Sequence, residues 1–159
     1  MGAKGEALAK QFEGKVRDAV AVLEKISDAD WKKVTANEKW PVGVTAHHAA
    51  TAFGAVAGMA SALASGQSRG ELSMAKLDEM NATHAKDHAS CTRAETIALL
   101  QKNATTAAAV LRNLSDDQLA KSGIVLTDAP PMSVEQIVTG GLILHLDDHF
   151  GSIRKTLGQ

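Results

Sequence analysis

Apolar residues recur every three or four positions through four long stretches of the chain, and this spacing constrains the fold more than any other feature. In residues 3–27, Leu8, Phe12, Val16 and Leu23 share one helical face, with charged residues between them. Similar periodicity extends through residues 44–64, 92–114 and 134–157. Strand-like alternation of useful length is absent between them. The sequence therefore predicts an all-α protein built as a four-helix bundle.

Shorter signals mark the ends of these helices. The link SGQSRG, residues 65–70, follows the second stretch, and a short additional helix is expected at residues 73–88, between helices two and three. Thr92 with Glu95, and Ser133 with Gln136, have the spacing of capping boxes that begin helices three and four. We expect one domain over residues 1–159, an antiparallel bundle with up-and-down or crossover connections.

Composition narrows the environment and the partners. Hydrophobic residues make up 45% of the chain but aromatic residues only 3%, so alanine and aliphatic side chains must fill the core. The net charge of −1 includes no basic cluster, so nucleic acid is not an expected partner. The lone Cys91 excludes an internal disulfide, and residues 49–64 are too short and weakly apolar to cross a membrane. With no apolar core of a signal peptide, we expect a cytoplasmic protein that binds no membrane.

The histidines are the most informative polar residues. All six occur in pairs, which are His47 with His48, His84 with His88, and His145 with His149. Two pairs are four residues apart, which on a helix places both imidazoles on one face roughly 6 Å apart. Such a pair can bind one metal ion through bonds of about 2.0 to 2.1 Å, with a third ligand from another helix.

The setting of each histidine differs. His145 and His149 follow Val138 and Leu142 on the predicted buried stripe of the last helix, where polar rings need partners. His48 lies on the apolar stripe of helix two. A core histidine bonded to a backbone carbonyl is the alternative for His48. The inward-facing pair on the last helix favours a metal ligand instead.

The remaining histidines have other expected surroundings. His84 and His88 lie among polar residues, so we expect both to face water. His47 points about 100° away from His48. Its stripe contains Gly54 and Gly58, small residues that suit close helix packing within the subunit or across a dimer.

Two segments resemble a known family. The stretches WPVGVTAHHAA and HLDDHFGSIRKTLG look like the DinB-like superfamily of four-helix metal proteins, and the resemblance covers nearly the whole chain. That superfamily includes maleylpyruvate isomerase and transferases that use mycothiol or bacillithiol. The resemblance implies a homodimer and a divalent metal bound by His48, His145 and His149. Mycothiol-dependent members often have a carboxylate at the position of His145, and bacillithiol-like members often have a histidine at that of Phe150, so the likeness is to the superfamily rather than to either branch.

A three-histidine site has a defined chemistry. Three neutral imidazoles leave a coordination position open, as catalytic sites do. Nitrogen ligands suit divalent transition metals such as Zn²⁺, Ni²⁺ or Fe²⁺ better than Mg²⁺ or Ca²⁺. We therefore expect a metal-dependent enzyme of the thiol-transferase or hydrolase type, activating a thiol or water. Its substrate would be a small molecule, with low-molecular-weight thiols among the candidates. The alternative is a metal-binding or structural bundle without catalysis.

Two further features are expected to have no role in the metal site. Asp147 and Asp148 project off the ligand face of the last helix, so we expect them to be solvated acids. Cys91 has no activating neighbour in sequence apart from Arg93, and we expect it to be structural or incidental.

Overall fold

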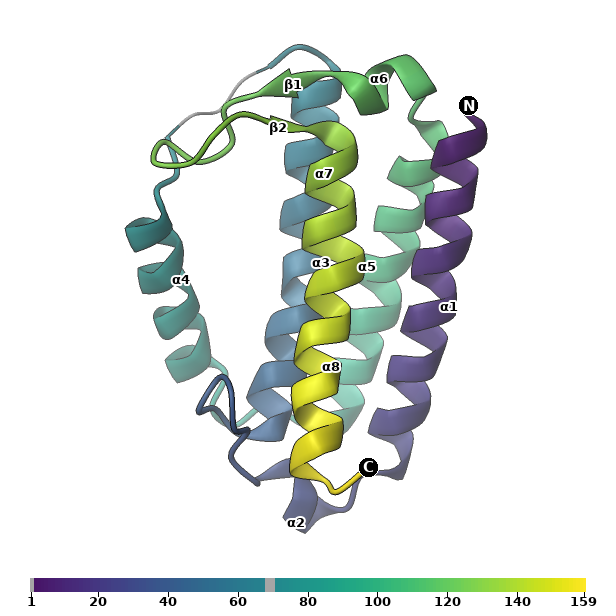
Figure 1. Cartoon of the computed structure of the whole chain (residues 1–159). Coiled ribbons are helices and arrows are strands. Elements are labelled where there is room, and N and C mark those ends of the chain that lie inside the picture. Colours follow the sequence, from purple (N-terminus) through teal and green to yellow (C-terminus); the bar gives the residue numbers. More distant parts are fainter. Residues whose placement is uncertain (1, 68–70) are drawn as a thin grey trace.

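The computed structural model describes residues 2–67 and 71–159, and four long helical segments form a bundle (Figure 1). The segments are α1 (Ala3–Lys25), α3 (Val42–Ala64), α5 (Arg93–Asn113) and a last segment made of α7 (Val134–Val138), η1 (Thr139–Leu144) and α8 (His145–Thr156). The predicted all-α four-helix bundle is confirmed. Residues 68–70 of the predicted link lie outside the described residues. Within the described residues, no helix is both long and apolar enough to span a membrane.

Only some neighbouring helices have the expected antiparallel arrangement. The helices contact one another in the order α1, α5, α3 and then the last segment. Figure 1 shows α3 and α5 running in one direction and α1 and α8 in the other, so the neighbours α3 and α5 are parallel. The cause is the short additional helix, α4 (Met74–Asp87). It carries the chain back along the outside of α3, so that α5 begins at the end of the bundle where α3 began (Figure 1).

The core is filled as the composition predicts. Phe12 of α1 and Phe53 of α3 meet edge to face, with ring centroids 4.9 Å apart, and both are fully buried. Around them lie leucines and many buried alanines. Small side chains let the helices approach closely, which compensates for the scarcity of aromatic residues.

Capping boxes begin several helices. Both predicted boxes are present, at Thr92 before α5 and at Ser133 before α7. Another box at Ser115 begins α6 (Asp116–Ala120). A small antiparallel sheet follows, in which β1 (Ser122–Gly123) pairs with β2 (Met132–Ser133). This sheet, which the sequence analysis did not predict, leads the chain into α7.

The last segment is not one regular helix. Between α7 and α8 lies the π-helical η1, whose wider turns rotate the residues that follow it. A Cβ atom added at Gly141 would lie 2.8 Å from both methyl carbons of Val56, so glycine permits α3 to approach here. The buried apolar stripe of α8 runs through Leu146, Phe150 and Ile153. His145 and His149, which the sequence places on this stripe, instead lie half-buried on the face beside it, and His145 meets His48 of α3.

The segment before α3 is closed by short contacts. The one-turn helix α2 (Asp28–Trp31) places the Trp31 indole over Gly43, where a Cβ atom would lie 2.3 Å from the ring. The Trp31 Nε1 atom donates a hydrogen bond to the carbonyl oxygen of Cys91, at 3.0 Å. A β-bridge between Val34 and Pro41 then closes a loop at the start of α3.

Candidate metal centre

Three histidines from two helices that are far apart in sequence meet between α3 and α8. The Nε2 atom of His145 lies 3.2 Å from Nε2 of His48 and 3.0 Å from Nε2 of His149. We call these residues the first histidine cluster. The structure thus brings together the three residues that the sequence analysis selected. Their role as metal ligands stays a prediction.

The contacts of these rings leave nitrogen lone pairs that could bind a cation. His149 uses Nδ1 to donate a hydrogen bond to Oε1 of Glu38, at 2.8 Å, so its Nε2 presents a lone pair. A neutral His145 has at most one hydrogen at Nε2, which can serve only one of its two close contacts well. Metal bonds of about 2.0 to 2.1 Å that meet at roughly 90 to 110° place ligand nitrogens about 2.8 to 3.4 Å apart. Both observed spacings fall in that range.

The electrostatics keep two of these rings, His48 and His145, neutral. Burial, together with repulsion from neighbouring imidazoles such as His149, lowers the pKa of His48 to about 3. Burial likewise lowers the pKa of His145 to about 4. Neutral imidazole is the form that binds metals, so near pH 7 both rings are ready to act as ligands.

Glu38 is a part of the site that the sequence analysis missed. Its side chain is 10% exposed, and its Oε2 atom accepts a hydrogen bond from the Ser152 hydroxyl at 2.7 Å. Burial raises the pKa of Glu38, but hydrogen bonds from Ser152 and His149 outweigh it and hold the pKa below its ordinary value. A carboxylate that accepts from the far nitrogen of a histidine fixes the orientation of the ring.

The loop between α2 and α3 places Glu38 beside the histidines. The backbone N–H of Thr35 donates to the carbonyl oxygen of Trp40 at 2.8 Å, and the Thr35 hydroxyl donates to the same oxygen at 3.1 Å. The Trp40 ring lies edge-on to His48, with centroids 5.3 Å apart. The loop therefore supports the first histidine cluster from two sides.

The other three histidines also meet. The Nδ1 atom of His47 lies 2.9 Å from Nε2 of His84, and the His47 ring stacks on His88 with centroids 4.1 Å apart. We call them the second histidine cluster. The expectation that His84 and His88 face water was wrong, because α4 packs along α3 and half buries both rings against His47.

The expected close packing at the glycine stripe of α3 does not occur within the subunit. Gly54 and Gly58 are exposed, and a Cβ atom added at either would meet nothing within 4 Å. Packing across a homodimer stays a prediction.

Among the described residues, neither the Cys91 thiol nor the two acids, Asp147 and Asp148, forms a hydrogen bond or ion pair with a histidine side chain, and Asp147, expected to be solvated, is half-buried. Burial raises the pKa of Cys91, so the thiol is protonated at neutral pH. Asp147 forms an ion pair with Lys15 of α1, at 2.7 Å, and Asp148 is exposed.

An apolar cavity opens beside the first histidine cluster. This inner pocket has a volume of about 360 Å³ and includes His48, His145 and His84 in its wall. The rest of the wall is mostly apolar and includes Ile137 and Met80.

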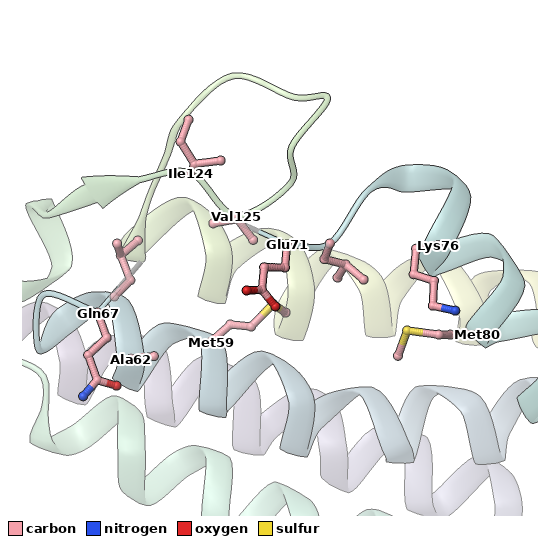
Figure 2. A pocket seen from close by; sticks show the side chains of 10 residues that line it. Met59, Ala62, Gln67, Glu71, Lys76, Met80, Ile124 and Val125 are labelled. Atoms are coloured by element: carbon pink, nitrogen blue, oxygen red, sulfur yellow. The ribbon is translucent and has the colours of Figure 1, made fainter. Parts of the chain in front are cut away.

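A second cavity, the outer pocket of about 330 Å³, adjoins the inner one, and Figure 2 shows side chains that line it. The two share Met59, Leu72, Met80 and Val125. Among the described residues, Glu71 and Lys76 are the charged ones of the outer wall.

Comparisons with known proteins agree with this fold. The family model of the DinB superfamily matches residues 11–153. A similar solved structure is YfiT from Bacillus subtilis, described as a probable metal-dependent hydrolase with an unusual four-helix bundle topology. It is 19% identical to this chain, with a TM-score of 0.66 over 98% of this chain and 86% of YfiT. No curated protein matches the sequence. Because the family match extends over most of its length, the chain belongs to the DinB superfamily.

Proposed function

We propose that this protein is a divalent-metal-dependent hydrolase acting on a small, largely apolar molecule. The observation that supports this most strongly is the convergence of three imidazole nitrogens, at 3.0 and 3.2 Å, beside an apolar pocket. Two of these histidines, His48 and His145, form part of the pocket wall. A substrate in the pocket would therefore lie against the cluster.

The residues of the first histidine cluster would hold the metal, with Zn²⁺, Ni²⁺ or Fe²⁺ as candidates. When bound, such a cation supplies a Lewis acid that lowers the pKa of water or of a thiol toward neutrality. Three histidine ligands would leave a coordination position of the ion open, and water or a thiol could occupy it. Glu38 holds the His149 ring in place through Nδ1 and makes its Nε2 a stronger electron donor.

The pocket wall indicates the substrate class. The inner pocket contains Thr51 and Asn81 as its polar residues besides the histidines, and no charged residue among those described. The Thr51 hydroxyl donates its hydrogen to the carbonyl oxygen of His47, at 3.0 Å. An uncharged ester or amide with an apolar substituent suits this wall, because burying an unpaired charge there would be unfavourable.

Thiol transfer is the second candidate, and the outer pocket is the observation that favours it. Glu71 and Lys76 could pair with the charged groups of a low-molecular-weight thiol whose sulfur reaches the first histidine cluster. Lys76 is already paired with Glu79, however, at 3.0 Å. The described wall therefore offers little free positive charge for a carboxylate, and we place hydrolysis first.

Reconstitution tests this proposal. Untagged protein would be freed of metal with a chelator and reloaded with one equivalent of Zn²⁺, Ni²⁺ or Fe²⁺. It would then be assayed on esters and amides with apolar acyl groups, and on thiol consumption with bacillithiol, mycothiol and glutathione. We expect hydrolysis to require metal and to fall by at least about 100-fold in His145→Ala, which removes a ligand. The control Asp148→Asn, an exposed neighbour of His149, should keep full activity.

The outcomes separate the candidates. Metal-dependent thiol consumption without hydrolysis would contradict the hydrolase and support thiol transfer. Neither activity, in protein that binds metal, would support a bundle without catalysis.

A further inference from the structure

We infer that the second histidine cluster is a second divalent-metal site, separate from the first histidine cluster. It consists of His47 from α3 with His84 and His88 from α4. The proposed function makes no use of these residues, so this inference goes beyond it.

The geometry resembles that of the first cluster. The 2.9 Å between Nδ1 of His47 and Nε2 of His84 falls in the range of about 2.8 to 3.4 Å expected for two ligands of one ion. His84 and His88 lie one turn apart on α4, with ring centroids separated by 4.5 Å. One nitrogen from each of the three rings lies within 4.8 Å of the other two.

A simple hydrogen bond explains only part of this arrangement. One hydrogen shared between His47 and His84 accounts for their contact. It leaves Nδ1 of His84 buried without a hydrogen-bond partner in the described part of the chain. The ring of His88 contacts its two neighbours through ring contacts alone, since no hydrogen bond of its side chain is found among the described residues. Half-buried imidazoles normally have partners, so the cluster has unused ligand capacity.

Nearby charge favours a cation at this point. Glu95 acts electrostatically on His47, and Asp87 acts on His84. Carboxylate charge beside the cluster attracts a divalent ion. The all-nitrogen donor set selects a transition metal such as Zn²⁺, Co²⁺ or Ni²⁺ over Mg²⁺ or Ca²⁺.

The second site should bind more weakly than the first. His84 and His88 are more open to solvent than His48. Within the described residues, no carboxylate accepts a hydrogen bond from any of the three rings, whereas Glu38 supports His149. Because such support typically changes metal affinity by about 10 to 100-fold, we expect the second ion to bind at least about tenfold more weakly.

The two clusters face the same cavity. His84 lines the inner pocket with His48 and His145, and the rings of His48 and His84 have centroids 5.8 Å apart. A second ion would therefore lie beside the space where a substrate contacts the first cluster.

Metal stoichiometry tests the inference without an activity assay. Untagged, chelator-treated full-length protein would be dialysed against rising Co²⁺. Bound metal would be measured by elemental analysis and nitrogen ligation by visible absorption. We expect two ions in the wild type, one in the double variant His84→Ala with His88→Ala, and one in His145→Ala. The control Lys86→Ala, an exposed residue of α4, should keep both. Circular dichroism would check that each variant folds. The single variant His88→Gln removes one ligand with less disturbance, and we expect it to weaken binding of the second ion by at least about tenfold.

The results distinguish this inference from the proposed function. A double variant that keeps every ion the wild type binds would overturn the second site. One ion that is lost only in His145→Ala would do the same while leaving the proposed function intact. One ion that survives in His145→Ala and disappears in the double variant would support the second site and contradict the proposed catalytic centre.

Discussion

Replacing Glu38 by glutamine is a sharp test of the site, because it removes one charge while keeping the shape of the side chain. The wild-type carboxylate accepts hydrogen bonds from His149, at 2.8 Å, and from Ser152, at 2.7 Å. The carboxamide oxygen of glutamine can still accept from His149, and its NH₂ group can donate to the Ser152 oxygen. Both contacts can persist, but the His149 ring then faces a neutral group.

The size of the effect follows from the lost charge. A hydrogen bond to a charged group contributes about 1.5 to 3 kcal/mol, whereas a neutral one contributes about 0.5 to 1.5 kcal/mol. Because the Glu38 side chain is only 10% exposed, solvent screens little of this difference. A loss of about 1 to 1.5 kcal/mol corresponds to roughly five- to fifteen-fold weaker metal binding. This agrees with the lower end of the range of about 10 to 100-fold measured for such supporting carboxylates.

The assay is competition for Zn²⁺ against a chromophoric chelator near neutral pH. Ser152→Ala is the matched control, because it removes the other partner of Glu38 but leaves the carboxylate on His149. We expect about tenfold weaker binding in Glu38→Gln and less than about threefold in Ser152→Ala. Wild-type affinity in Glu38→Gln, or equal losses in both variants, would refute a role for the charge.

Two further predictions concern stability. Unfolded histidines titrate near 6.5, whereas the pKa is about 3 for folded His48 and about 4 for folded His145, so the unfolded state binds more protons between these values. The free energy of unfolding of metal-free protein should therefore fall as pH drops from about 6.5 toward 4, and a flat profile in urea denaturation would contradict this. Gly141→Ala should destabilise by about 1 to 3 kcal/mol because the new methyl group meets Val56. Gly140→Ala, which meets open space, should be neutral or gain up to about 1 kcal/mol, and equal melting temperatures for the two variants would refute this.

Local patterns in the sequence were sufficient to predict the helices. The apolar periodicity around Phe12 and the boxes at Thr92 and Ser133 depend on neighbours within a few residues, and the structure contains each of them. The convergence of His48 with His145 was also predictable, because an inward-facing histidine pair requires a partner from another helix.

Features that depend on tertiary packing were not predictable. Glu38 lies in a loop without periodicity, and only the closure of that loop brings it to His149. His84 looks like a solvated residue in sequence, because the direction of α4 along α3 cannot be deduced from α4 itself. The π-helical η1 arises where α3 packs against Gly141, a contact between segments far apart in sequence. The parallel pairing of α3 with α5 likewise depends on how α4 packs along α3, which the sequence of α4 does not reveal.

Anomalous diffraction from crystals grown with Zn²⁺ would locate the ion itself. We expect a peak at the zinc edge within roughly 2.0 to 2.1 Å of Nε2 of His48, His145 and His149. Crystals with no peak between these rings, or with the three rings held apart by apolar side chains, would contradict the proposed metal site.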